Sequence, residues 1–104
     1  MPEKIKYDKL VRDNIPDIIK EKGEDCVTRI AEQHEYLQKL KEKLQEELNE
    51  FFESDSEEEL ADMLEVIYAI MAEKGMKKEQ LEEIRVKKLE KRGGFSRKII
   101  LEES

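Results

Sequence analysis

Cysteine is nearly absent from this sequence, tryptophan is absent, and no run of apolar residues approaches the length of a membrane span. The single cysteine, Cys26, has no partner for an intrachain disulfide, which is typical of proteins in a reducing compartment. A membrane-spanning helix would need about 20 apolar residues, and the first residues lack the apolar stretch of a signal peptide. We therefore expect a soluble, cytoplasmic protein with no membrane partner.

Charged residues are abundant instead, at 45% of 104 residues, against 38% hydrophobic residues. Glu, Lys and Leu, which are all good helix formers, dominate the sequence, and this composition favours helices over a β-sandwich. The length suits one small domain, and no repeat or long linker divides it. We predict a single all-α domain over residues 1–104, a small antiparallel bundle of about four helices.

The charge is distributed unevenly along the chain. The net charge is −7, and residues 42–65 hold eleven acidic residues against one base, Lys43. Basic residues gather in 84–98. Because a nucleic-acid-binding protein is usually basic, we do not expect DNA or RNA as a partner.

Helix start and stop signals predict where the four helices lie. Asn14 and Pro16 favour a helix start, and Gly23 ends that short helix. The segment 27–31 is expected to be a connector. The remaining helices are expected at about 32–53, from the Ser54–Ser56 break to about 74, and at about 78–91 before Gly93 and Gly94.

The predicted helix over 32–53 carries a core stripe of five apolar residues (Leu37, Leu40, Leu44, Leu48 and Phe51). At about 100° per residue, Glu47 lies about 60° and Glu50 about 120° to the same side of that stripe. The spacing places Glu47 and Glu50 one turn apart on one edge of the buried face. Glu46 is expected on the opposite, solvent-facing side.

The next predicted helix is apolar nearly all round, so we expect it to be buried nearly all round. Asp62 lies inside its apolar run, with Glu59 one turn earlier, and residues 44–73 contain no Lys or Arg. An ionised carboxylate out of water costs several kcal/mol without a cation or donors, so the compensating positive charge must come from outside this hairpin.

The sequence allows two interpretations of these acidic residues. Acidic runs are usually solvated faces, and both Ser56-x-x-Glu59 and Ser54-x-x-Glu57 fit a capping box. Alternatively, Glu47, Glu50, Glu59 and Asp62 converge from antiparallel helices on one point. Carboxylates without His or Cys nearby suit a hard cation, Mg²⁺ or Mn²⁺. The single histidine, His34, is expected on the surface.

The acidic motifs EExxE (46–50) and ExxD (59–62) resemble those of the all-α nucleotide pyrophosphohydrolases, the MazG-like and phosphoribosyl-ATP pyrophosphohydrolase-like group. YDKLVRD (7–13) and RGGF (92–95) are similar to signatures of a small-protein branch of that group. Eight residues separate Glu50 from Glu59, fewer than the spacing usual in MazG proteins. The resemblance implies that Glu47, Glu50, Glu59 and Asp62 hold Mg²⁺.

The same resemblance implies hydrolysis of a nucleoside triphosphate or related nucleotide to the monophosphate and pyrophosphate. In this interpretation Glu46 is the candidate base. The candidate phosphate-binding residues are Lys9, Arg12, Arg92 and Arg97, with the Gly93–Gly94 turn folding over the metal site. The alternative is a non-catalytic helical interaction module whose acidic face binds a basic partner. In either case the apolar faces of the 57–74 helix predict a homodimer or higher homo-oligomer.

Overall fold

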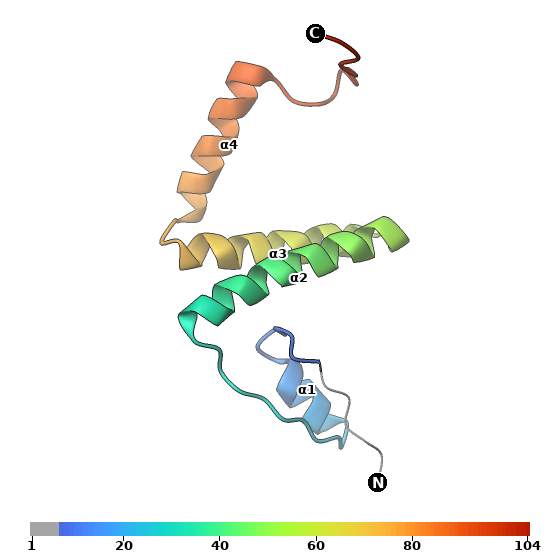
Figure 1. The fold of residues 1–104 in the computed structure, drawn as a ribbon, viewed down its shortest axis with the longest axis vertical. Helices are drawn as coiled ribbons and strands as arrows, with labels where there is room; N and C mark the ends of the chain where they lie inside the picture. Colours follow the sequence, from blue (N-terminus) through green and yellow to red (C-terminus); the bar gives the residue numbers. More distant parts are fainter. Residues whose placement is uncertain (1–6) are drawn as a thin grey trace. The chain divides into compact units, whose positions relative to one another are not determined.

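The computed structural model describes residues 7–104, and all regular structure in that range is helical (Figure 1). The helices are α1 (Ile15–Glu21), α2 (Gln33–Ser54), α3 (Glu57–Glu73) and α4 (Lys78–Arg92). The predicted all-α class and the four helices are confirmed, with ends within two residues of those expected. None of these helices combines the length and the apolar character that a bilayer crossing requires.

The chain divides after Ile70 into two compact units. The prediction of one domain over 1–104 stays a prediction. The first unit contains α1, α2 and most of α3, and the second contains α4 and the C-terminal tail.

Residues 7–14, which we call the N-terminal strap, have no helical or strand structure and lead into α1. Pro16 lies in the first turn of α1, as predicted, where its missing N–H costs nothing. Asn14 occupies the N-cap position, as predicted, but its side chain makes no capping hydrogen bond. The backbone instead enters the helix through a turn in which the Ile15 N–H donates to the Arg12 carbonyl at 3.1 Å.

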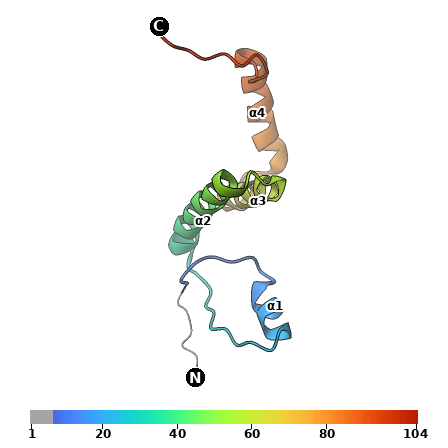
Figure 2. The same ribbon diagram turned by 90° about the vertical axis from the view of Figure 1, so that its right-hand side faces the viewer.

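Helices α2 and α3 form an antiparallel hairpin and lie side by side in two perpendicular views (Figures 1 and 2). Leu40 on α2 is 2% exposed, and Val66 on α3 is also buried. The other four residues of the predicted stripe, Leu37, Leu44, Leu48 and Phe51, are half-buried. The periodicity of α2 therefore identified the face on which the hairpin packs.

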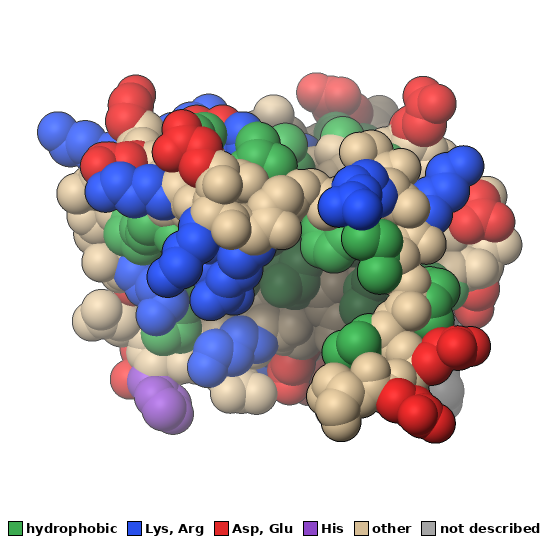
Figure 3. Space-filling model, turned by 90° about the horizontal axis from the view of Figure 1, so that it is seen from above, with side chains coloured by type: hydrophobic (Ala, Val, Ile, Leu, Met, Phe, Trp, Pro, Cys, Tyr) green, Lys and Arg blue, Asp and Glu red, His purple; other side chains and the backbone are tan. Residues whose placement is uncertain are grey.

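Helix α3 is not buried nearly all round, contrary to the prediction. Leu60, Leu64 and Ile67 are 49%, 46% and 37% exposed. One neighbouring helix covers only part of a helix circumference, and these three residues, spaced by four and three positions, lie along another face. Figure 3 shows hydrophobic side chains among the charged ones on one face of the molecular surface.

In the second unit, the Lys77 N–H donates to the Gln80 side chain at 2.8 Å at the start of α4. Gly93 ends the helix with φ 82° and ψ 175°, while its N–H donates to the Leu89 carbonyl at 2.8 Å. Its φ is positive, but its ψ is extended, so Gly93 does not have the left-handed helical conformation. Glycine adopts this positive-φ combination without the strain that a Cβ would introduce.

Replacing Leu40 with Ala should lower the free energy of unfolding by about 2–5 kcal/mol, because the cavity would open in the best-buried part of the hairpin. Urea denaturation followed by circular dichroism measures the loss. Leu89→Ala is the control, since Leu89 is 45% exposed, and it should cost far less. Equal losses in the two variants would contradict the packing described for α2.

Candidate metal centre

The turn between α2 and α3 determines which side chains are free to form a site. Asp55 closes α2 in the left-handed conformation, with φ 52°. The Ser56 hydroxyl accepts a hydrogen bond from the Glu58 N–H at 3.2 Å, so Ser56 caps α3. The Ser56 N–H donates to the Ser54 hydroxyl at 3.1 Å, in the place that Glu59 would take in a capping box. The turn thus leaves the Glu59 carboxylate available for other contacts.

Three carboxylates meet beside this turn. Glu47 and Glu50 on α2 and Glu59 on α3 each offer an oxygen atom, and these atoms lie within 4.8 Å of one another. Glu47 is buried, with 7% of its surface exposed. Oε2 of Glu47 and Oε2 of Glu59 are both buried and accept no hydrogen bond. We call Glu47, Glu50 and Glu59 the carboxylate cluster.

Repulsion within the carboxylate cluster raises the pKa values of Glu50 and Glu59. The adjoining Glu47 carboxyl, followed by burial and by Glu50, raises the pKa of Glu59 to about 7. The Glu47 carboxyl also raises the pKa of Glu50 above its ordinary value. At neutral pH the cluster therefore shares a proton, unless a cation takes the proton's place.

Asp62, the fourth predicted ligand, does not join the cluster. Its Oδ1 accepts a hydrogen bond from Nη2 of Arg12 at 2.7 Å. Its side chain is 36% exposed, so Asp62 is less buried than its apolar neighbours predicted. For Asp62 the positive charge comes from outside the hairpin, as predicted, whereas Glu47 has Lys43 of α2 itself at 3.5 Å.

Glu46 also differs from expectation, because it is half-buried and does not point freely into solvent. Its carboxylate accepts hydrogen bonds from Lys9 at 3.0 Å and from Lys43 at 3.3 Å. Burial alone would raise the pKa of Glu46, but the contacts with Lys9 and Lys43 together lower it below its ordinary value. The hydrogen bond to Glu46 is the largest cause of the raised pKa of Lys9.

Lys43 was given no role from the sequence. Its Nζ lies 3.5 Å from Oε1 of Glu47, and the side chain is largely buried. The spacing of three and four residues from Lys43 to Glu46 and Glu47 is the signal that could have identified it. Lys43 provides positive charge on one side of Glu47 and leaves Oε2 without a partner.

A cavity of about 540 Å³ opens between the strap, α1 and the hairpin. Its charged lining includes Arg12, Lys43, Glu47 and Asp62, and its apolar lining includes Leu40. Glu47 is the member of the carboxylate cluster that lines this cavity, so its carboxylate shares the space with cations and apolar surface. Such a combination suits a ligand with a charged end and a flat or apolar end.

The remaining predicted phosphate-binding residues, Arg92 and Arg97, belong to the second unit. Both side chains are exposed, and both line a hollow of about 440 Å³ formed by residues 92–100. Their predicted role at the phosphates stays a prediction.

The carboxylate cluster fits a hard divalent cation. It offers only oxygen donors, from a two-helix scaffold, and two of its buried oxygens have no partner. His34, the single histidine, lies exposed on α2.

In comparisons with known proteins, no family model, no curated protein and no solved structure matches this chain.

The raised pKa of Glu59 predicts how stability depends on pH without divalent cations. The folded protein binds this proton more tightly than the unfolded chain does, so stability should fall as pH rises from about 4.5 to about 7. Thermal melts at pH 5 and pH 8 in a chelating agent test this. In Glu59→Gln the decrease should be smaller.

Glu58→Gln is the matched control, since Glu58 also lies in the first turn of α3 but is exposed. It should keep the wild-type dependence on pH. A wild-type melting temperature that rises between pH 5 and pH 8 in the chelating agent would contradict the repulsion described for the cluster.

Proposed function

We propose that this protein is a Mg²⁺-dependent nucleotide pyrophosphohydrolase, which hydrolyses a nucleoside triphosphate or a related nucleotide to the monophosphate and pyrophosphate. The observation that carries the proposal is the carboxylate cluster, with buried oxygens that accept no hydrogen bond. The motif order, EExxE and ExxD between YDKLVRD and RGGF, supports membership of the MazG-like group.

In this proposal Glu47, Glu50 and Glu59 would hold the cation, and Asp62 would join them from one turn further along α3. Bound Mg²⁺, or Mn²⁺, would neutralise phosphate charge and lower the pKa of a bound water. Carboxylates fixed on two helices would need little rearrangement to bind the cation, which favours binding by the folded state.

The strap and Lys43 would bind the substrate's negative charge. Arg12 and Lys43 line the same cavity as Glu47, so a phosphate chain there would meet cations from two directions. Apolar lining residues with accessible surface, such as Val11 and Ile18, would contact the nucleoside. The lowered pKa of Glu46 makes it a weak proton acceptor, which favours a role in holding Lys9 over a role as the base.

The activity is tested by measuring pyrophosphate release from a panel of nucleoside triphosphates, with and without Mg²⁺. We expect Mg²⁺-dependent release by the wild type and a loss of at least 100-fold in kcat/KM in Glu59→Gln, because one ligand loses its charge. Glu58→Gln should retain activity. Turnover that is unaffected by chelation, or equal in the two variants, would contradict the proposed metal site.

An inactive protein that binds no cation would favour the alternative, an interaction module whose acidic face binds a basic partner. That outcome is separable from loss of folding, because circular dichroism reports the helices directly.

We also propose that the protein forms a homodimer or a higher homo-oligomer through α3. Leu60, Leu64 and Ile67 form an exposed apolar row on this helix, and such rows mark interfaces. Leu64→Glu should reduce the mass measured by sedimentation at micromolar concentration to that of the monomer. The control Ile30→Glu changes a residue that is 96% exposed in the connector before α2, and it should leave the mass unchanged. A monomeric wild type would contradict this assembly.

A further inference from the structure

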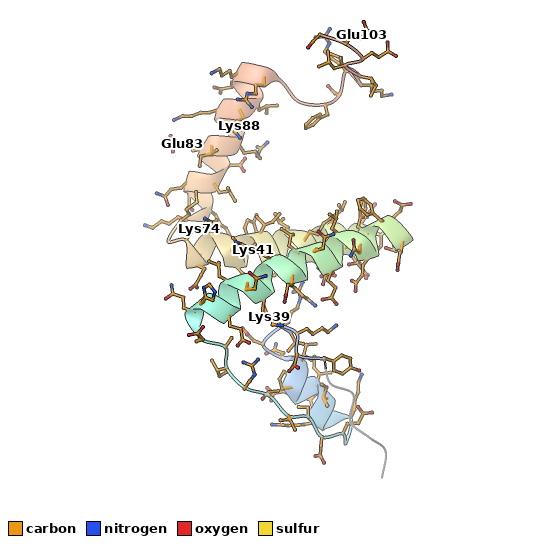
Figure 4. The ribbon with its side chains drawn as sticks, in the orientation of Figure 1. Lys39, Lys41, Lys74, Glu83, Lys88 and Glu103 are labelled. Atoms are coloured by element: carbon orange, nitrogen blue, oxygen red, sulfur yellow. The ribbon has the colours of Figure 1, made fainter. Side chains whose placement is uncertain are left out.

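The N-terminal strap connects the two helices of the hairpin through charged side chains. Lys9 contacts Glu46 on α2, and Arg12 contacts Asp62 on α3. The strap backbone is held as well, because Nζ of Lys39 on α2 donates to the Asp8 carbonyl at 2.7 Å (Figure 4). A segment without regular structure is thereby fixed against both helices.

The contacts that hold the strap can break at low energetic cost. In the Arg12–Asp62 pair the side chains are 57% and 36% exposed, and such pairs contribute little because water screens them. Tyr7 and Val11 are also exposed, so few apolar contacts reinforce the strap. Segments held mainly by exposed polar contacts open at low cost.

Asp62 lies one turn after Glu59 on α3, close to the carboxylate cluster, yet its Oδ1 is occupied by Arg12. The cluster has its own indication of a ligand, since Oε2 of the nearly buried Glu47 accepts no hydrogen bond. A cation held by the cluster would attract the Asp62 carboxylate, and it would repel the guanidinium that now contacts it.

We propose that Arg12 and a divalent cation compete for Asp62, so that the Arg12–Asp62 contact is a latch that is closed without metal and released by metal. This inference rests on the proposed metal site and adds a regulatory step to it. Arg12 lines the cavity in which Glu47 and Asp62 lie, so the released guanidinium stays beside that cavity. There it can form a bidentate contact with a phosphate group.

The latch is reciprocal: whatever weakens the Arg12–Asp62 contact must tighten cation binding by the same factor. Isothermal titration calorimetry with Mn²⁺ at pH 8 measures this in the full chain. Arg12→Gln should lower the Kd for Mn²⁺ about two- to fivefold, the range expected for an exposed ion pair. Lys9→Gln is the matched control, because it removes one positive charge from the same strap but frees Glu46, which lies outside the cluster. Its effect should be smaller.

Hydrogen exchange of the Ile15 amide, whose N–H donates to the Arg12 carbonyl, gives a second readout that is independent of activity. Saturating Mn²⁺ should speed this exchange in the wild type, because Arg12 is released. In Asp62→Asn, Mn²⁺ should change the exchange little, because the competition is gone. The wild-type measurement needs no substitution, so it decides the question even where a variant folds poorly.

The outcomes separate the latch from the metal site. A wild type that binds Mn²⁺ while Arg12→Gln and Lys9→Gln change the Kd equally would show a general charge effect and overturn the latch alone. Slower exchange of the Ile15 amide on Mn²⁺ binding would do the same. A wild type that binds no Mn²⁺ would overturn both the latch and the proposed metal site.

Discussion

The repulsion among Glu47, Glu50 and Glu59 is the constraint on which the rest of the site depends. Their oxygens lie within 4.8 Å of one another, next to the apolar contact between α2 and α3. Three charges at that separation are unfavourable unless a proton or a cation lies among them. This repulsion raises the pKa of Glu59 to about 7, so the cluster binds a proton more readily than a free carboxylate does. A divalent cation would replace the proton and satisfy the buried oxygens.

The local structure maintains this unfavourable arrangement. The Ser54 hydroxyl accepts the hydrogen bond that Glu59 could otherwise accept at the helix start. Lys9 and Arg12 contact acids outside the cluster, and Lys43 contacts Oε1 of Glu47, so Oε2 of Glu47 and Oε2 of Glu59 keep no hydrogen-bond partner. Functional sites commonly keep their side chains in an arrangement that lowers the stability of the folded protein.

The helices and the cluster could largely be predicted from the sequence. Apolar periodicity, glycines and the Ser54–Ser56 break located the helices, and helical geometry placed Glu47 and Glu50 on one edge of the packed face. The contacts of the strap could not be predicted, because Lys9 and Arg12 meet partners 37 and 50 residues away from a segment without periodicity.

Exposure on α3 was also mispredicted. Periodicity reports which residues are apolar and does not report how much of a helix its neighbours cover. Asp62 was expected in the cluster for a related reason, since helical geometry gives its position on α3 but not its ion pair with Arg12.

Crystals of the protein grown at pH 8 with Mn²⁺ would test the central claim most directly, because the anomalous scattering of Mn²⁺ locates the ion without assumptions about ligands. The account predicts an ion coordinated by oxygens of Glu47, Glu50 and Glu59. A cluster that holds no ion at saturating Mn²⁺ would contradict it, even if an ion binds elsewhere on the protein.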